Sequence, residues 1–167
     1  MRARLFLPLT LLLAVGEAGS VAAQAGDPGD VDFVLVEKAA RRLTLYSQGR
    51  AVRVYNAIQL GGAPVGAKHF EGDERTPEGR YTIDYGNPDS AYHLSLHISY
   101  PSPRDTAYAR AHGRSPGGMI MIHGQPNGWA AGRAPGDWTD GCIALSNAQI
   151  EQLWETVGDG TPIEIRP

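Results

Sequence analysis

Alternation of apolar and polar residues over short segments dominates the pattern of this chain. It runs through residues 31–37, 43–47, 52–58 and 80–85, and through 93–100, where Leu and Ile alternate with His and Ser. A period of two is typical of β-strands that bury one face. Turns are frequent as well, because the chain contains 21 Gly and 12 Pro. The pattern predicts a mostly β domain whose first three strands form an antiparallel meander.

Two segments follow a helical pattern instead. The sequence from Ser146 to Gln149 is typical of a capping box, and apolar residues with helical spacing follow it: Ile150, Leu153, Trp154 and Val157. A shorter helix is expected near 103–112, where Pro103 can begin it and Gly113 can end it. Further short strands are predicted at apolar segments: 119–122, 141–145 and 162–165.

The first residues have the composition of an export signal. A basic start at 1–4 precedes an apolar run at 5–15, and Ala23-Gln24-Ala25 matches an A-x-A cleavage site. The apolar run is too short to span a bilayer, which takes about 20 residues. We therefore expect a secretory signal peptide that is cleaved after Ala25 or, as the second choice, after Ala23.

This interpretation divides the chain into a signal peptide at 1–25, a flexible leader at 26–30 and one folded domain at 31–167. The mature protein is then expected in the periplasm or outside the cell, without a stable membrane span. The formal net charge of the whole chain is −3. A mildly acidic domain is a poor partner for nucleic acid, whose phosphates require a basic surface.

The chain has a single cysteine, Cys142, and His123 lies 19 residues before it at the end of an apolar strand. A glycine follows the histidine and another precedes the cysteine. One cysteine cannot form an internal disulfide, so in an exported protein it is a buried inert residue, a partner for another chain, or a reactive thiol. An imidazole within hydrogen-bond distance would activate the thiol. We therefore interpret Cys142 as a nucleophile and His123 as its base.

The surrounding motifs favour this interpretation. His123-Gly124 followed by Thr139-Asp140-Gly141-Cys142 and Asn147 resembles the HG…[ST]-x-G-C motif of the L,D-transpeptidase catalytic domain (YkuD) family. Residues 76–79 (TPEG) resemble the TPxG turn of that family, and the SYP sequence at 99–101 resembles its YafK-like branch. The similarity extends over 31–167, essentially the whole mature chain.

The resemblance implies a YkuD-like β-sandwich of mixed sheets in which Cys142 accepts the acyl group and His123 is its base. It also implies that the Gly124 carbonyl orients the imidazole and that amides near Gly141 and Cys142 bind the oxyanion. Thr139 and Asp140 would support that loop. The implied substrate is a peptidoglycan stem peptide with a meso-diaminopimelate–D-Ala bond, and no cofactor or metal is implied.

Departures from the common family pattern leave the acyl acceptor open. Thr139 replaces Ser, Asp140 stands where His is frequent, and Ala144 stands where Arg is frequent. The missing Arg resembles the YafK-like branch, which includes hydrolases as well as transpeptidases. Water, another stem peptide, or a lysine of a wall-anchored lipoprotein are therefore all candidate acceptors.

Other polar and aromatic residues are weaker candidates for substrate binding. His93 and His97 share the polar face of one predicted strand; they lie about 13 Å apart, too far to bind one metal ion, so we expect groove lining. Arg75 could meet a substrate carboxylate, or could be an ordinary exposed charge. Trp138 and Trp129 flank the site in sequence, as a lid or as packing for their loop.

Two rival functions remain open from the sequence. A wall-binding module with an inert Cys–His pair is the alternative of another class. An exported cysteine protease for ordinary peptides is the weaker rival. A zinc site is the least favoured, because no Cys/His cluster has ligand spacing.

Overall fold

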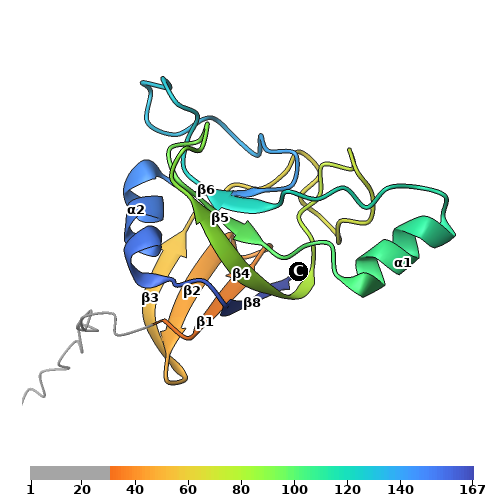
Figure 1. Cartoon of the computed structure of the whole chain (residues 1–167). Coiled ribbons are helices and arrows are strands. Elements are labelled where there is room, and N and C mark those ends of the chain that lie inside the picture. Colours follow the sequence, from red (N-terminus) through yellow and green to blue (C-terminus); the bar gives the residue numbers. More distant parts are fainter. Residues whose placement is uncertain (1–30) are drawn as a thin grey trace, which may run out of the picture.

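The computed structural model describes residues 31–167 (Figure 1), so the signal peptide and leader expected at 1–30 lie outside the described residues. The elements follow in this order: β1 (Phe33–Glu37), β2 (Arg42–Ser47), β3 (Arg50–Asn56), β4 (Gly79–Asn87), β5 (Ser95–Ile98), α1 (Pro103–Ala111), β6 (Met121–His123), β7 (Ile143–Ala144), α2 (Asn147–Thr156) and β8 (Thr161–Arg166).

The strands form one mixed eight-stranded sheet in the order β3-β2-β1-β8-β4-β5-β6-β7. Strands β1 to β3 pair antiparallel as the predicted meander, while β8 pairs parallel with β1 and antiparallel with β4. The last pair, β6 with β7, is parallel, with His123 opposite Ala144. The C-terminal strand thus joins the meander to the half of the sheet that contains His123.

The sheet curls so that its two ends meet. Beyond β3, Gln59 forms an antiparallel bridge with Ala144, the residue that ends β7, and Gly61 forms a parallel bridge with Thr139. The Gln59 and Ala144 backbones exchange both hydrogen bonds, at 2.9 and 2.8 Å. This closure brings the segment after β3 beside the residues that precede and follow Cys142.

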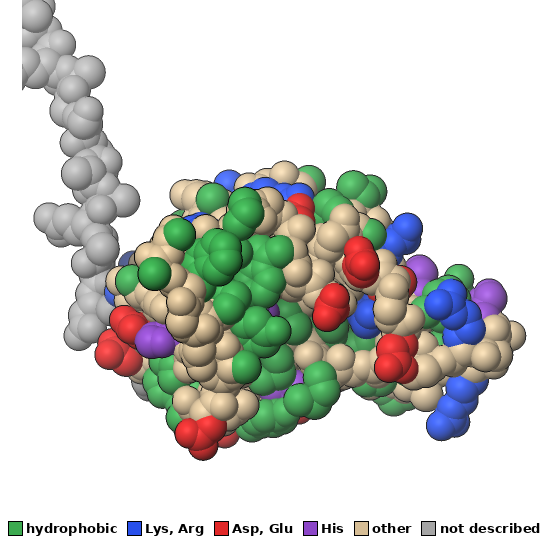
Figure 2. All heavy atoms as spheres, turned by 90° about the horizontal axis from the view of Figure 1, so that it is seen from above, with side chains coloured by type: hydrophobic (Ala, Val, Ile, Leu, Met, Phe, Trp, Pro, Cys, Tyr) green, Lys and Arg blue, Asp and Glu red, His purple; other side chains and the backbone are tan. Residues whose placement is uncertain are grey.

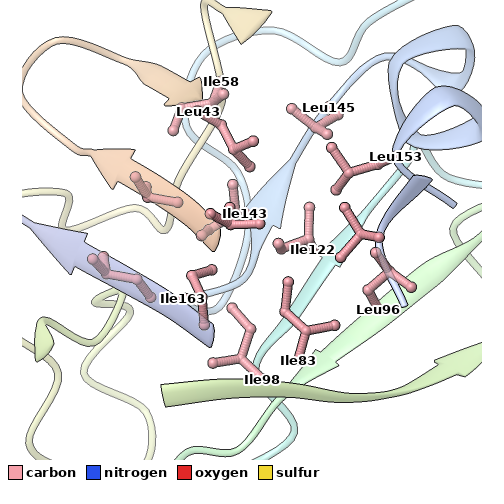
Figure 3. Packing of buried hydrophobic residues seen from close by; sticks show 14 of the residues in the cluster. Leu43, Ile58, Ile83, Leu96, Ile98, Ile122, Ile143, Leu145, Leu153 and Ile163 are labelled. Carbon is pink, nitrogen blue, oxygen red and sulfur yellow. The ribbon is translucent and has the colours of Figure 1, made fainter. Parts of the chain in front are cut away.

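One apolar core fills the inside of the curled sheet (Figure 3). Side chains from the meander, such as Leu43, meet Ile122 of β6 and Ile143 of β7, and α2 adds Ile150 and Leu153. The capping box at the start of α2 is present as predicted: the Ser146 hydroxyl accepts from the Gln149 amide. The helix therefore begins directly after the strand that follows Cys142.

The prediction of a mostly β fold with mixed pairing, a C-terminal helix and a short helix near 103–112 is confirmed. The strands belong to a single curled sheet, whose opposite ends face each other as the two sides of a sandwich would. Strand β5 is shorter than the alternation suggested, because His93 has a positive φ of 70° and ends the extended conformation. No helix in the described part of the chain is long and apolar enough to cross a membrane.

Candidate active site

Cys142 and His123 line the same cavity, of about 300 Å³, at the loop-bearing face of the sheet. Its other lining residues come from loops before β5, before β6 and before β7: Tyr92, Gly118, Met119, Ile120, Trp138, Thr139 and Asp140. Figure 2 looks down on this face and shows hydrophobic side chains gathered in its middle, with acidic side chains beside them. Arg and His side chains cluster at the end where α1 projects.

The position of Cys142 follows from the pairing of β6 with β7. Because Ile122 pairs with Ile143, one more step of the register puts Cys142 beside Met121. The Met121 amide donates to Cys142 Sγ at 3.3 Å, and the thiol donates to the Met119 carbonyl at 3.6 Å. Since side chains alternate between faces, Cys142 and His123 lie diagonally on one face of this pair.

The ring of His123 is buried and held in one tautomer. Its Nδ1 lies 2.7 Å from the Gly124 carbonyl oxygen, which can only accept, so Nδ1 carries the proton. Nε2 is then the basic nitrogen. The Gly124 carbonyl therefore has the orienting position that the sequence resemblance implied.

Both groups favour their neutral forms. Burial lowers the pKa of His123, and the hydrogen bond to Gly124 opposes this only in part. Burial also raises the pKa of the Cys142 thiol, and the Asp140 charge adds to that rise, while the Met121 amide and the Lys68 charge oppose it. Within residues 31–167 no hydrogen bond joins the two side chains directly. The site at rest is thus a neutral thiol and a neutral imidazole that share a cavity, and not an ion pair.

The loop before β7 provides a candidate oxyanion site. The Thr139 hydroxyl donates to the Cys142 carbonyl at 2.7 Å and accepts from the Gly141 amide at 3.2 Å, so both groups are already occupied. The Cys142 amide makes no hydrogen bond with any part of the described chain. Of the two amides that the resemblance implied, the Cys142 amide is therefore the one available to a substrate oxygen.

Gly141 is required by the close approach of three backbone segments. Its φ is +126°, and a Cβ there would lie 2.4 Å from the Arg75 carbonyl oxygen. A Cβ on Gly61 would likewise lie 2.0 Å from the Glu74 carbonyl oxygen and 3.0 Å from the Gly141 nitrogen. The Gly61 segment, the turn at Thr76 and the nucleophile loop thus pack backbone against backbone, which explains why these distant motifs occur together.

Gly124 is constrained in a similar way. A Cβ at this position would meet Asn147 Oδ1 at 2.7 Å, and both His93 Cβ and the Tyr92 carbonyl at 3.0 Å. Asn147, the last residue of the motif, accepts a 2.8 Å hydrogen bond from the Gln125 amide. The motif asparagine therefore fixes the chain just after His123 against the start of α2.

A second cavity, of about 690 Å³, adjoins the first and shares Gly118, Met119 and Asp140 with it. Its remaining lining residues include Lys68, Glu71 and Glu74. Lys68 is almost fully buried and pairs with Asp73 at 2.9 Å. Asp140 thus lies on the boundary between the cavity of the thiol and a larger polar hollow.

Of the weaker candidates from sequence, only Trp138 lines the cavity of the thiol. Its indole Nε1 is buried without a hydrogen-bond partner in the described residues, whereas Trp129 is exposed and outside the cavity. His97 shares a sheet face with His123, but it stacks on Tyr85 and pairs with Asp84 at 2.6 Å.

His93 and Arg75 also point elsewhere. His93 Nε2 lies 2.7 Å from Glu151 Oε1 on α2. The Arg75 guanidinium lies beside Gly66, while its carbonyl backs Gly141. The expected contacts of His93, His97 and Arg75 with substrate therefore have no support from their positions.

Residues that the sequence did not single out complete the site. The Tyr92 ring packs against the His123 ring, with centroids 4.6 Å apart and the two planes tilted by 32°. Buried Gln125 donates to the Leu145 carbonyl at 2.6 Å and accepts from the Ala134 amide at 2.7 Å, which anchors the loop after His123. Loop tyrosines and glutamines carry no sequence signal for such roles. Among residues 31–167, no three His, Cys, Asp or Glu side chains are arranged to hold a metal ion.

Comparisons with known proteins point to the same family. The chain matches the L,D-transpeptidase catalytic domain (YkuD) over residues 32–165. It is 30% identical over 135 residues to YafK of Escherichia coli K12, an L,D-transpeptidase by provisional name, with 77% of this chain and 48% of that protein covered. The chain thus spans about half the length of the curated relatives it matches.

Solved structures share the fold. The helical cell shape determining protein Pgp2 of Campylobacter jejuni is similar with a TM-score of 0.65 and 29% identity, over 86% of this chain and 52% of that chain. An L,D-transpeptidase from Xylanimonas cellulosilytica has a TM-score of 0.55 at 17% identity, over 82% of this chain and 61% of that chain. The second likeness shows the fold alone.

Proposed function

Because this chain belongs to the L,D-transpeptidase catalytic domain family, we propose that it is a cysteine acyltransferase or hydrolase of peptidoglycan stem peptides, with Cys142 as nucleophile and His123 as base. The observation that carries the proposal is the cavity that Cys142 shares with an imidazole whose Nε2 is left basic by the hydrogen bond from Nδ1 to Gly124. The proposed bond is the one between meso-diaminopimelate and D-Ala.

Acylation in this proposal proceeds from the neutral pair. As Cys142 Sγ attacks the diaminopimelate carbonyl carbon, His123 Nε2 takes the thiol proton, so no resting thiolate is needed. The developing oxyanion accepts a hydrogen bond from the Cys142 amide. The C–N bond to D-Ala then breaks, and the imidazolium returns its proton to the leaving amine. The product is a thioester on Cys142.

Deacylation repeats these steps with an acceptor in place of D-Ala. Water would give a shortened stem peptide, and an amine of a second stem peptide or of a wall-linked lipoprotein would give a cross-link. In each case His123 takes a proton from the acceptor, and Cys142 leaves as the thiol. Pgp2 is a helical cell shape determining protein; we propose that this chain likewise acts on the wall outside the cytoplasm, after removal of its signal peptide.

Mass spectrometry of the purified protein with defined muropeptides tests this proposal. We expect a thioester adduct at Cys142 with a meso-diaminopimelate tetrapeptide or a carbapenem, and release of D-Ala with the tetrapeptide. Cys142 is the only cysteine, so Cys142→Ala should lose both adduct and turnover while it keeps the fold. Adding a lysine-bearing acceptor separates transfer from hydrolysis. Full turnover by the alanine variant would contradict the proposal.

The rival of another class is a wall-binding module without catalysis. It predicts that the parent protein and its Cys142→Ala variant sediment equally well with isolated peptidoglycan, and that no adduct forms with either. Acylation by substrate distinguishes the two functions better than general alkylation, because burial raises the pKa of Cys142 and slows any reagent that needs the thiolate.

A further inference from the structure

Three aromatic rings form a compact cluster around the proposed base. The ring centroids of Tyr92 and His123 lie 4.6 Å apart at an interplanar angle of 32°, and those of His123 and Trp138 lie 5.6 Å apart at 62°. The Tyr92 and Trp138 rings also approach each other, at 5.7 Å. These separations fall in the range in which aromatic pairs attract one another. The imidazole therefore packs against two adjacent aromatic rings and is also held by its hydrogen bond to Gly124.

The backbone that carries Tyr92 is fixed to the residue after the base. The Gly124 amide donates to the Tyr92 carbonyl at 3.0 Å and to the Leu94 carbonyl at 3.2 Å. The His93 amide donates to Asn127 Oδ1 at 2.9 Å, and its ring reaches Glu151. His93 adopts a φ of 70°, a region that costs energy for a residue with a Cβ. This strained, anchored turn directs the Tyr92 ring toward His123.

Burial alone does not explain this placement. Tyr92 is 40% exposed, so its ring is not drawn into the core by the removal of apolar area from water. The part of the ring that is covered includes its contact with the imidazole and with Trp138. Tyr92 is held against His123 and still lines the cavity. This position suits a residue that orients the imidazole.

We propose that Tyr92, braced by Trp138, is a positioning residue that sets the plane of the His123 imidazole and shields it from water. The proposal rests on the proposed function, in which His123 Nε2 takes the thiol proton. The hydrogen bond from Nδ1 fixes one atom of the ring, and the Tyr92 ring packed against the imidazole restricts rotation of its plane.

The effect on the base has a physical signature apart from turnover. Removing the Tyr92 ring admits water to the imidazole, so the desolvation that lowers the pKa of His123 weakens. The other titratable groups in the cavity, Cys142 and Asp140, remain, as does the His93–Glu151 pair beside Gly124. The pKa of His123 is therefore expected to rise toward its ordinary value in Tyr92→Leu.

The chain provides a matched control. Tyr85 is 38% exposed and stacks on His97, with centroids 4.5 Å apart at 15°, outside the cavity of the thiol. Tyr85→Leu removes the same ring from a similarly exposed tyrosine–histidine contact, in which the rings are stacked at 15° instead of tilted by 32°. Tyr92→Phe keeps the ring at the site and removes only the hydroxyl.

The experiment measures the acylation rate against pH for the full protein and its Tyr92→Leu, Tyr92→Phe and Tyr85→Leu variants. Tyr92→Leu is expected to lower the rate constant about 10- to 100-fold, as loss of orientation does, with little change in KM. The acidic limb of its pH profile should move to higher pH. Tyr92→Phe and Tyr85→Leu should stay within about 3-fold, as changes outside the reacting geometry do.

Nuclear magnetic resonance of His123 in a Cys142→Ala background provides a second readout that needs no turnover. We expect Tyr92→Leu to raise the pKa of His123, and Tyr85→Leu and Tyr92→Phe to leave it unchanged. An unaltered pKa and rate in Tyr92→Leu would overturn the inference. Equal loss in Tyr92→Phe would also overturn it, since the hydroxyl and not the ring would then matter. A protein that never forms an adduct would contradict the proposed function, while the resonance measurement still decides the role of Tyr92.

Discussion

The two ends of the sheet are built by different interactions. The meander of β1, β2 and β3 is held by long ladders, in which β1 and β2 pair from Phe33–Tyr46 to Glu37–Arg42. Strand β6 has three residues and β7 has two. Their positions depend on polar side chains that bind backbone groups of loops, notably buried Gln59 and Gln125 and exposed Asn147. Apolar alternation thus builds the scaffold, whereas specific hydrogen bonds and close backbone packing build the site.

Gly141, in the loop that carries the nucleophile, provides the most direct test of this distinction between scaffold and site. Gly141→Ala puts a Cβ 2.4 Å from the Arg75 carbonyl oxygen at a φ of +126°, so the loop must shift. We expect acylation to fall by about 1000-fold or more, because the nucleophile and the Cys142 amide move together. The control is Gly136→Ala, at a φ of +65° with nothing within 4 Å, which carries backbone strain without a clash. Acylation kinetics and near-ultraviolet circular dichroism measure both variants. Equal losses of acylation rate in the two variants would show that backbone strain, and not the clash with Arg75, causes the loss.

A core substitution in the meander should lower stability and leave turnover unchanged. Leu43 is fully buried in β2, so Leu43→Ala is expected to lower the free energy of unfolding by about 3 kcal/mol. Turnover at a temperature where the variant is folded should stay unchanged, because no contact of the cavity is lost. The control is Val54→Ala at a half-exposed position of β3, with an expected change within about 0.5 kcal/mol. A large loss of turnover in folded Leu43→Ala would contradict the separation of scaffold and site.

Much of the fold and the central pair could be predicted from sequence, because both depend on local signals. Alternation located the strands, the Ser146–Gln149 capping box located α2, and the glycines beside His123 and Cys142 marked the site. The contacts of His97 could not be predicted: register puts it on the face of His123, but its side chain turns to Asp84 and Tyr85. Alternation reports the face of a strand, and it does not report the direction of a side chain on that face.

Substitution of Gln125, which anchors the loop after His123, tests the role of buried polar groups directly. Gln125→Leu keeps a similar volume but leaves the Leu145 carbonyl and the Ala134 amide without their partner. An unpaired buried group costs about 1–3 kcal/mol. The Leu145 carbonyl is buried whereas the Ala134 amide is only partly buried, so we expect a loss of about 2 kcal/mol in the free energy of unfolding, mainly from the carbonyl. Amide hydrogen exchange should also accelerate in the loop after His123. Gln152→Leu, on the exposed side of α2, is the control; unchanged exchange in Gln125→Leu would contradict the anchoring role.

The smallest expected effect concerns the charge at the boundary of the two cavities. Asp140 is exposed and its charge contributes to the raised pKa of Cys142, after the larger effect of burial. A raised thiol pKa means that the thiolate fraction appears only at higher pH. Asp140→Asn removes the charge, so the rate of alkylation by iodoacetamide should reach its half-maximum at lower pH than in the parent protein.

Asp159→Asn is the matched control, because it removes an exposed carboxylate that does not affect Cys142. If Asp140→Asn and Asp159→Asn shift the alkylation curve equally, net charge and not proximity is responsible. A selective shift by Asp140→Asn would mean that the family position often occupied by His has a different electrostatic effect here. Burial, with a smaller contribution from the Asp140 carboxylate, favours the protonated thiol, so the imidazole must supply the activation that a resting ion pair would otherwise provide.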